Sequence, residues 1–147
     1  MSAAEMSGLE LLQGIFTGAI PPGSFTDLVP VHAGSNTSVS RGRVVFESMA
    51  DHRHLNPMGG VHGGFAATLL DSVTGCAVMS MLESGVTYAT VDLNVKMVQP
   101  VPQNCTLVVE GNALHVSKSI GVAEGSIKDE SGKLLAHGTA TLVLKRD

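Results

Sequence analysis

The segment between Val61 and Glu83, VHGGFAATLLDSVTGCAVMSMLE, constrains the fold more than any other part of the chain. Residues 64–82 contain no proline, lysine or arginine, and their single charged residue is Asp71. Apolar side chains cover almost the whole circumference of the helix that this segment predicts, and such a helix must be buried on all sides, in a core or in lipid. The length suits a membrane span of roughly 20 residues. The central carboxylate and the lack of flanking lysine or arginine clusters favour a core helix instead.

The composition indicates one domain with part of its surface covered by another protein surface. The chain has 147 residues, enough for one hydrophobic core. We expect a single domain over residues 1–147, in which residues 1–30 form an N-terminal helix and loop extension. Charged residues are 15% of the chain, well below the usual share. Oligomerisation is the simplest explanation of so few charges, so we expect a homo-oligomer.

Charge and cysteine content exclude several classes of protein. The net charge is −4, there is no basic run, and aromatic residues are 3% of the chain; nucleic-acid binding calls for basic patches or stacking platforms. Two cysteines, Cys76 and Cys105, fit reduced thiols rather than a disulfide framework. The N-terminal residues include two glutamates where a signal peptide has basic residues. We therefore expect a cytoplasmic protein that binds neither nucleic acid nor membrane.

The rest of the chain predicts one short helix and five strands. Helical spacing of apolar residues places the helix over Glu5–Phe16. The expected strands are Val39–Phe46, Tyr88–Val98, Cys105–Val116, Ile120–Lys128 and Leu134–Leu144. In the second of these, alternation places Val91 and Leu93 on one face and Tyr88 and Thr90 on the other. Asp129-Glu130-Ser131-Gly132 predicts a hairpin turn. Short connections indicate an antiparallel sheet, and curling it around the apolar helix would bury that helix, which predicts an α+β fold.

A glycine-rich stretch, Gly59-Gly60-Val61-His62-Gly63-Gly64, leads into the apolar helix. The first amides of a helix lack intrahelical partners and carry the positive end of its dipole, and glycine lets a ligand oxygen come close. This combination suits an oxyanion hole for a polarised carbonyl, whereas a P-loop would need a lysine after the glycines. The alternative is that the glycines only turn the chain tightly against the sheet.

His62 and Asp71 are the polar candidates on this helix. Nine residues separate them, which corresponds to a rotation of about 900° and a rise of about 13.5 Å. One chain cannot easily bring both side chains to one carbonyl, but two antiparallel helices related by a two-fold axis can. Each Asp71 would then face His62 and Gly63 of a second copy. The structural alternatives are an N-cap role for His62 and, for Asp71, a core carboxylate bonded to neighbouring backbone.

Residues 56–64 (NPMGGVHGG), Asp71 in the helix and the strand motif Val91-Asp92-Leu93-Asn94 together resemble the hotdog-fold acyl-CoA thioesterases. The PaaI-like branch, which includes the phenylacetyl-CoA type, is the most similar, and the resemblance covers roughly residues 40–145. It implies a hotdog fold, an antiparallel sheet wrapped around a long central helix. It also implies hydrolysis of an acyl-CoA without metal or cofactor, in a homodimer or dimer of dimers with active sites shared between subunits.

The resemblance implies a catalytic role for five residues. Asp71 would be the nucleophile or general base, and the Gly63 amide would bind the oxyanion. Asn56 and His62 would orient the water and the thioester. Thr90 occupies a position where some relatives have a serine that assists the water.

Three further residues are candidates for substrate binding. Gly64 adjoins the oxyanion amide, and Lys118 and Ser119 lie between two strands, where relatives often contact the CoA phosphates. A solvated turn is the alternative for Lys118. The H-x-H pair in residues 51–54 could bind zinc but lacks further ligands, so we expect no metal. Cys76, deep in an apolar helix, would have a raised pKa and be a poor nucleophile.

Two other functions are compatible with these residues. One is a hotdog acyl-CoA dehydratase or hydratase, which would use a histidine and a carboxylate as acid and base. The other is a non-catalytic acyl-CoA-binding protein. Turnover of an enoyl-CoA would identify the first, and CoA binding without thiol release the second. The acyl group stays open, because the candidate pocket residues permit aryl or medium alkyl chains: Met49, Met58, Met79 and Met81.

Overall fold

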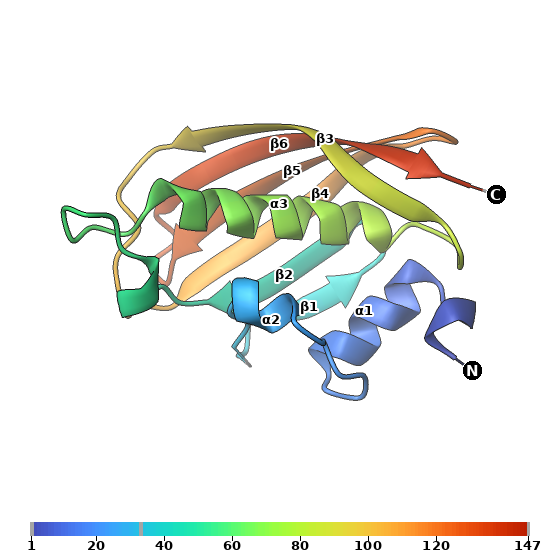
Figure 1. Cartoon of the computed structure of the whole chain (residues 1–147), viewed down its shortest axis with the longest axis horizontal. Coiled ribbons are helices and arrows are strands. Elements are labelled where there is room, and N and C mark those ends of the chain that lie inside the picture. The colour runs from blue at the N-terminus through green and yellow to red at the C-terminus, as the bar shows by residue number, and fades with distance from the viewer. Residues whose placement is uncertain (1, 33, 147) are drawn as a thin grey trace.

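The computed structural model describes residues 2–32 and 34–146. One long helix, α3 (Gly63–Met79), lies along one face of a six-stranded antiparallel sheet (Figure 1). The strands are β1 (Ser38–Ser40), β2 (Arg43–Ser48), β3 (Thr87–Met97), β4 (Leu107–Val116), β5 (Ile120–Asp129) and β6 (Leu134–Lys145). Their order in space is β1-β2-β4-β5-β6-β3, so β1 and β3 are the edges. This arrangement confirms the expected α+β fold, with an antiparallel sheet around a long helix.

Most of the expected strands are confirmed, and one divides in two. Four agree with the structure within two residues at each end: 88–98, 105–116, 120–128 and 134–144. The expected strand 39–46 is wrong in one respect, because it consists of β1 and β2 with a turn between them. Gly42 forms this turn with a φ of 83°, in the left-handed region that glycine adopts without steric penalty. Its amide donates to Ser80 Oγ at 2.8 Å, which joins the turn to the end of α3.

The sheet-facing side of α3 forms the centre of the core. Leu69, Leu70 and Val73 have no exposed surface. Gly111 of β4 lies against the Val73 carbonyl, and a Cβ at this position would collide with that carbonyl. Only glycine therefore lets β4 approach α3 so closely. The apolar content of the α3 segment thus predicted the position of the core correctly.

The expectation that α3 is buried on all sides is wrong for the single chain. Gly64 and Asp71 are exposed and Thr68 is half-buried. These residues are three or four positions apart and therefore share one face of the helix. We call this face the open stripe of α3 (Gly64, Thr68 and Asp71). Its residues are small or polar, so the helix can leave this face uncovered without placing large apolar side chains in water.

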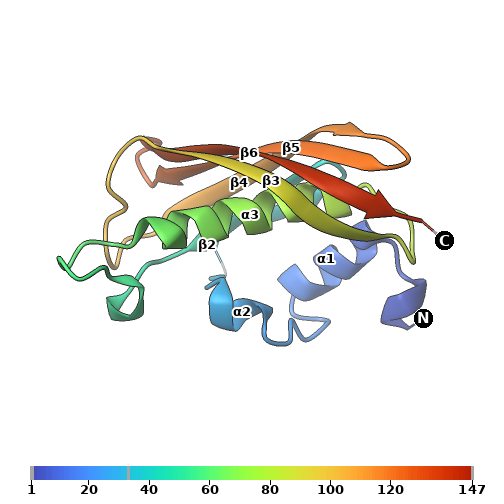
Figure 2. The same ribbon diagram turned by 45° about the horizontal axis from the view of Figure 1, so that its top comes forward.

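The N-terminal segment forms α1 (Gly8–Phe16) and α2 (Phe25–Leu28), on the other side of α3 from β5 and β6 (Figure 2). The expected helix over 5–16 begins three residues later because Ser7 caps it. The Ser7 hydroxyl accepts a hydrogen bond from the Glu10 amide at 3.3 Å, and the Glu10 carboxylate accepts one from the Ser7 amide at 2.8 Å. This reciprocal pair is a capping box, and it fixes the helix start.

A β-bulge changes which side chains of β3 face α3. The pairing with β6 shifts between Thr90 and Asp92, which leaves Val91 as the extra residue with 60% of its surface exposed. Tyr88 contacts α3, and Leu93 packs against the core. The strict alternation expected for this strand is therefore wrong. Because of the bulge, Tyr88 and Thr90 lie on the same side of the sheet as Leu93 rather than opposite it.

Candidate active site

The N-terminus of α3 presents one free amide, that of Gly63. His62 is the N-cap, and its Nδ1 accepts a hydrogen bond from the Gly64 amide at 2.8 Å. The His62 carbonyl accepts a hydrogen bond from the Phe65 amide at 2.9 Å. No described residue accepts a hydrogen bond from the Gly63 amide, and Gly63 is exposed. A carbonyl oxygen placed there would meet both this N–H and the positive end of the helix dipole.

The capping bond also defines what the His62 ring can do. Nδ1 is the acceptor, so in the neutral imidazole the proton is on Nε2, which is the donor left for a substrate or water. The structural alternative for His62, an N-cap, is therefore present in the structure. It is compatible with the predicted orienting role because the two roles use different ring nitrogens.

Asn56 organises the loop before α3. Its Oδ1 accepts hydrogen bonds from the Met58 amide at 2.9 Å and the Gly60 amide at 3.2 Å. Its own amide donates to the Gly60 carbonyl at 2.7 Å. The side-chain oxygen is thus used inside the loop, and Nδ2 is the group left to face a thioester or a water. Any direct role for Asn56 must therefore be that of a donor.

Asp71 lies on the open stripe, two turns of helix beyond Gly64. Among residues 2–32 and 34–146, no amide or side chain forms a hydrogen bond or ion pair with the Asp71 carboxylate. The alternative of a buried carboxylate bonded to neighbouring backbone is therefore wrong. An exposed carboxylate without a structural partner can accept a proton or attack an electrophile.

Two contacts show that β3 runs beside α3 in the opposite direction. Met97, at the end of β3, has its Cε 3.4 Å from the point where a Cβ on Gly63 would lie. Tyr88, near the start of β3, has its Cε2 3.4 Å from the corresponding point on Gly75. Asp71 lies between the Gly63 and Gly75 contacts along α3, so it is level with the bulge in the middle of β3. The predicted polar residue at that bulge is Thr90, which is half-buried on the side that faces α3.

Tyr88 is a site residue that sequence reasoning missed. Although 39% of Tyr88 is exposed, burial of its ring against α3 raises the pKa of its hydroxyl to about 12. Smaller contributions to this raised pKa come from Cys76 and from the charge of Asp71. The available signal was its position two residues before Thr90, which places both side chains on one face of a strand.

Lys118 and Ser119 lie far from Gly63 within one chain. They are exposed in the turn between β4 and β5, where the Ser119 carbonyl accepts a hydrogen bond from the Leu144 amide at 2.8 Å. The next residue but one, Gly121, packs against Val78 near the end of α3. That end is about 22 Å along the helix from Gly63. The structure does not bring these two residues to the oxyanion amide, and their contact with CoA stays a prediction.

Other candidate groups are occupied or inert. His54 Nδ1 accepts a hydrogen bond from the Asp51 amide at 2.9 Å, so the H-x-H pair is part of a local turn. In the part of the chain that the structure describes, no group of three or more histidine, cysteine or acidic residues could hold a metal ion. Burial raises the pKa of the Cys76 thiol to about 12, which makes it a poor nucleophile. None of the described helices is both long enough and apolar enough to cross a membrane.

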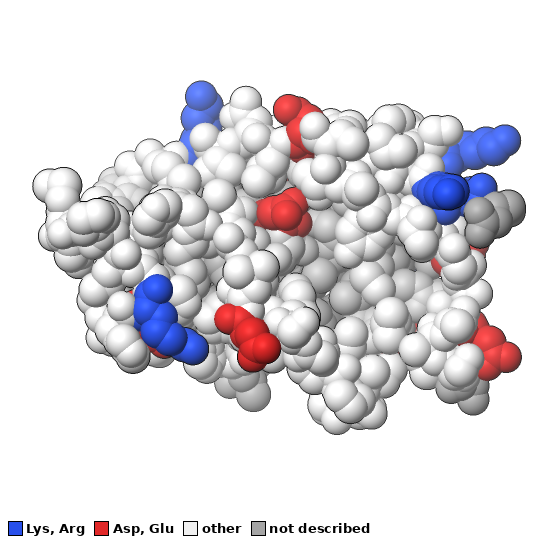
Figure 3. Space-filling view, in the orientation of Figure 1, with Lys and Arg blue, Asp and Glu red and all other residues white. Residues whose placement is uncertain are grey.

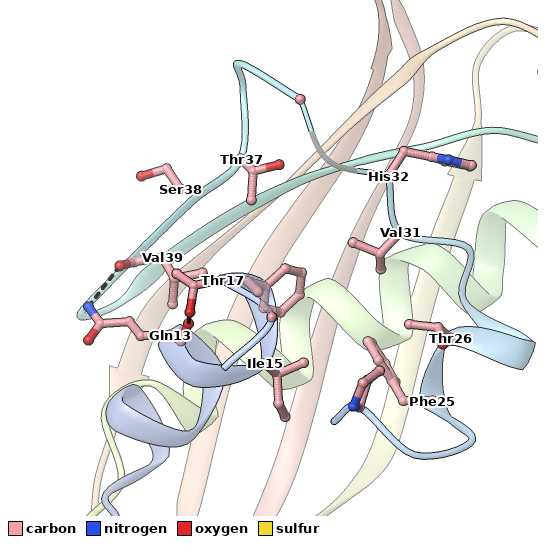
Figure 4. Close-up of a pocket in the computed structure, with 14 residues that line it drawn as sticks. Gln13, Ile15, Thr17, Phe25, Thr26, Val31, His32, Thr37, Ser38 and Val39 are labelled. Atoms are coloured by element: carbon pink, nitrogen blue, oxygen red, sulfur yellow. Dashed lines mark hydrogen bonds between the residues drawn. The ribbon is translucent and has the colours of Figure 1, made fainter. Parts of the chain in front are cut away.

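Two cavities of the described residues involve the N-terminal segment with α1 and α2. The smaller, about 230 Å³, adjoins the site and is lined by His62, Gly64 and Thr68 together with Leu28 of α2. The larger, about 860 Å³, lies between α1, α2 and β1 (Figure 4). None of the predicted site residues is among the described residues that line it. The larger cavity is thus separate from the site at the start of α3.

Comparison with known proteins identifies the family. The thioesterase superfamily matches residues 58–136, which is more than half of the chain. Human acyl-coenzyme A thioesterase 13 is 29% identical over 105 residues, which cover 71% of this chain and 74% of that protein. The mouse protein of the same name is 30% identical over 105 residues, with the same coverage.

Solved structures of thioesterases share the fold of this chain. A thioesterase from Ralstonia eutropha JMP134, described as phenylacetic acid degradation-related, superposes with a TM-score of 0.77 at 26% identity, over 89% of this chain and 97% of that one. Zebrafish thioesterase superfamily member 2 superposes with a TM-score of 0.73 at 27% identity, over 93% and 98%. The matched residues 58–136 include α3 with its glycine-rich start and all of β3, β4 and β5. The chain therefore belongs to the thioesterase superfamily and is a thioester hydrolase.

Proposed function

We propose that this protein hydrolyses an acyl-CoA thioester to the free acid and CoA. The observation that carries the proposal is that α3 exposes both an amide without a hydrogen-bond partner, at Gly63, and a carboxylate without one, at Asp71. Relatives named acyl-coenzyme A thioesterase support the choice of substrate. The cytoplasmic location expected from the sequence stays a prediction.

In this mechanism the thioester oxygen accepts the Gly63 N–H and gains negative charge as the carbonyl carbon is attacked. Asp71 either attacks that carbon itself or takes a proton from the attacking water. Collapse of the tetrahedral intermediate breaks the carbon–sulfur bond and releases CoA as the thiolate. Where water attacks, the other product is the free acid; where Asp71 attacks, a mixed anhydride forms, and a water then hydrolyses it to the free acid and restores the Asp71 carboxylate. His62 Nε2, Asn56 Nδ2 and the Thr90 hydroxyl are the remaining donors, and they orient the thioester and the water.

The proposed site is completed by a second copy of the chain. Gly63 and Asp71 are too far apart along one helix to reach the same carbonyl easily. In two antiparallel helices related by a two-fold axis, Gly63 of each copy would lie near Asp71 of the other, which gives two shared sites. The face over α3 carries few and scattered charges (Figure 3). The neighbouring edge strand exposes apolar side chains, namely Val91 at 60%, Met97 at 53% and Val98, just after the strand, at 51%. A second β3 pairing along this edge would bring the two open stripes together.

The direct test is Asp71→Asn, which keeps the size of the side chain but removes its basic oxygen. Thiol release is measured across a panel of acyl-CoA substrates that includes an enoyl-CoA, to test hydration as well. We expect kcat to fall by at least about 100-fold, the scale of a positioned acid–base group. KM should hold because the lost interaction belongs to the transition state. The melting temperature should be unchanged or higher.

The matched control is Asp27→Asn, which makes the same change at an exposed position on α2 and should leave turnover unchanged. Near wild-type turnover in Asp71→Asn would remove Asp71 from the mechanism. Binding of acyl-CoA without thiol release in the wild-type protein would support a non-catalytic binding protein instead.

Complementation tests whether the site is shared. Gly63→Pro removes the proposed donor N–H, so both this variant and Asp71→Asn should be inactive alone. A mixed dimer contains one intact site, so mixing the two variants should restore part of the activity. Gly63→Ala is the control, because it retains the amide and its Cβ would meet only the Met97 methyl group at 3.4 Å. Mixed dimers that form without recovering activity would contradict the shared site, provided that Gly63→Ala is active.

A further inference from the structure

Tyr88 lies across the same face of α3 that carries Asp71. It is the single tyrosine of the chain. Its ring lies over Gly75, and its hydroxyl is 3.7 Å from Met79 Sδ. Asp71, Gly75 and Met79 are spaced by four residues, so they form one row along the helix. The ring therefore closes the row one turn beyond the proposed catalytic carboxylate.

Gly75 allows this close approach. It is buried in the interior of α3, where glycine is less favourable than alanine by about 1 kcal/mol. With no Cβ on Gly75, the edge of the Tyr88 ring rests on the helix backbone. A methyl group there would contact the ring at 3.4 Å and its neighbouring atoms at 3.8–3.9 Å. The ring thus lies one van der Waals contact away from position 75, where a methyl group would just fit.

Beyond the Tyr88 ring, the row of Asp71, Gly75 and Met79 ends where the start of α1 packs against α3. The backbone of Gly8, at the start of α1, lies directly against the Met79 carbonyl, so a Cβ on Gly8 would collide with it. The Gly8 amide donates to the Leu82 carbonyl at 2.9 Å. A chain extending from Asp71 along α3 would therefore meet Tyr88 and Met79 as a wall.

The distance from Asp71 to this wall suits a compact acyl group. Gly75 is about 6 Å along the helix axis from Asp71. Aromatic rings pair edge-to-face or offset with their centres about 4.5–7 Å apart. An aromatic acyl group whose carbonyl lies at Asp71 would thus be at pairing distance from Tyr88, and the Met79 thioether would give a second favourable contact.

We propose that Tyr88 determines acyl specificity by closing the row of Asp71, Gly75 and Met79 along α3, so that the enzyme accepts aromatic or short acyl groups and rejects long alkyl chains. This inference rests on the proposed thioesterase site and adds the class of acyl group to it. Tyr88 acts as a specificity residue and takes no part in the proton transfer. Its ring, rather than its hydroxyl, makes the selection.

The test compares kcat/KM for arylacetyl-, butanoyl- and dodecanoyl-CoA in the wild-type protein, Tyr88→Ala and Tyr88→Phe. The wild-type protein should prefer the arylacetyl or butanoyl substrate. Tyr88→Ala should raise the dodecanoyl-to-arylacetyl ratio by at least about 10-fold, the scale of one to two methylenes in an apolar pocket. Tyr88→Phe, which keeps the ring, should retain the wild-type ranking. Leu114→Ala, which shortens an exposed side chain on β4, is the matched control and should also retain it.

An unchanged ranking in Tyr88→Ala would overturn the proposal. Tyr88→Leu serves where Tyr88→Ala does not fold. It keeps an apolar side chain but removes the ring, so kcat/KM for the arylacetyl substrate should fall more than that for butanoyl-CoA, and equal effects on both would overturn the proposal. Failure of the proposed function is distinguishable, because then no substrate of the panel releases thiol in the wild-type protein.

Binding gives a second readout that does not depend on turnover. The chain has no tryptophan, so Tyr88 is the source of its tyrosine fluorescence. In Asp71→Asn, an arylacetyl-CoA should change this fluorescence, and CoA at equal absorbance should not. The same change with CoA alone would place the acyl group elsewhere.

Discussion

The two edges of the sheet differ in how they are protected. β1 has three residues, and α1 lies beside it, with Gln13 Nε2 donating to the Val39 carbonyl at 3.1 Å (Figure 4). β3 has eleven residues and exposes Val91 and Met97. Long apolar edge strands tend to pair with another chain, and proteins usually shorten or cover them. The N-terminal segment thus covers one edge of this sheet and leaves the other available for a second copy.

The same division applies to α3. Its sheet-facing side is filled with buried aliphatic residues, and the α1 side is closed at Gly8 by direct backbone contact with Met79. The side near β3 carries the free Gly63 amide, Asp71 and Tyr88. The packing that stabilises the fold and the proposed catalytic groups are therefore on different sides of one helix. Substitutions on the covered side should change unfolding, and those on the open side should change assembly and turnover.

The largest expected effect follows from a charge on the open edge. Val91→Asp places a carboxylate in the proposed pairing surface, so the protein should become monomeric and lose at least about 100-fold in kcat/KM with its shared sites. Sedimentation and thiol release measure the two effects. Leu114→Asp is the control, because Leu114 is 57% exposed on β4, away from the edge. A monomeric Val91→Asp protein with full activity would contradict the shared site, and an unchanged dimer would place the interface elsewhere.

The next effect is on the covered side. Leu12 of α1 is 3% exposed, so Leu12→Ala should lower the free energy of unfolding by about 2–5 kcal/mol, the usual range for a large-to-small change in a core. Denaturant titration measures the change. Turnover per folded molecule should stay near wild type, because Leu12 faces the core and not the open stripe. Loss of turnover in the folded variant would show that the covered side also shapes the site.

A smaller effect should follow from removing the cap of α1. Ser7→Ala loses the hydroxyl that accepts from the Glu10 amide, and N-cap changes of this kind cost about 1 kcal/mol in the free energy of unfolding. Ser24, the N-cap of α2, makes no side-chain cap hydrogen bond, so Ser24→Ala should change stability by less. Equal effects of the two variants in denaturant titrations would argue against the capping box as the cause.

Hydrophobic periodicity was sufficient to locate α3 and most strands. Apolar residues over 61–83 and alternation along the later strands reflect burial, and burial dominates the choice of element. The bulge in β3 could not be predicted, because the alternating pattern of residues 88–98 continues through it without a break. The turn at Gly42 carried a signal, a glycine inside the expected strand 39–46, that was available in the sequence.

The sequence supplied the residues of the candidate site, whose catalytic roles stay predictions, but not their surroundings. A single charge on an apolar helix pointed to Asp71, yet the expected burial was wrong because the sheet and α1 leave one face of α3 open. The N-cap role of His62 leaves Nε2 for the proposed donor role only because Nδ1 bonds the Gly64 amide, and no sequence pattern specifies which ring nitrogen does so. Tyr88 was missed because no sequence pattern pairs it with Gly75, beside which its ring lies in the structure.

The smallest effect concerns the ionisation of Tyr88. Burial against α3 raises the pKa of this hydroxyl to about 12, from an ordinary value of about 10. Between these two pH values the unfolded chain releases the tyrosine proton and the folded chain keeps it. The folded state then binds more protons, so stability should fall as pH rises above about 10.

The chain has one tyrosine, so tyrosinate absorbance after a rapid pH jump reports Tyr88 alone. Asp71→Asn removes a negative charge that opposes ionisation, so it should lower the midpoint. Tyr88 of the Val91→Asp monomer should titrate above its ordinary pKa, and Tyr88 of the wild-type protein should do so as well if a second copy covers β3. A wild-type midpoint near 10 would show that water surrounds the ring, and the wall that Tyr88 is proposed to form beyond Asp71 would then be absent.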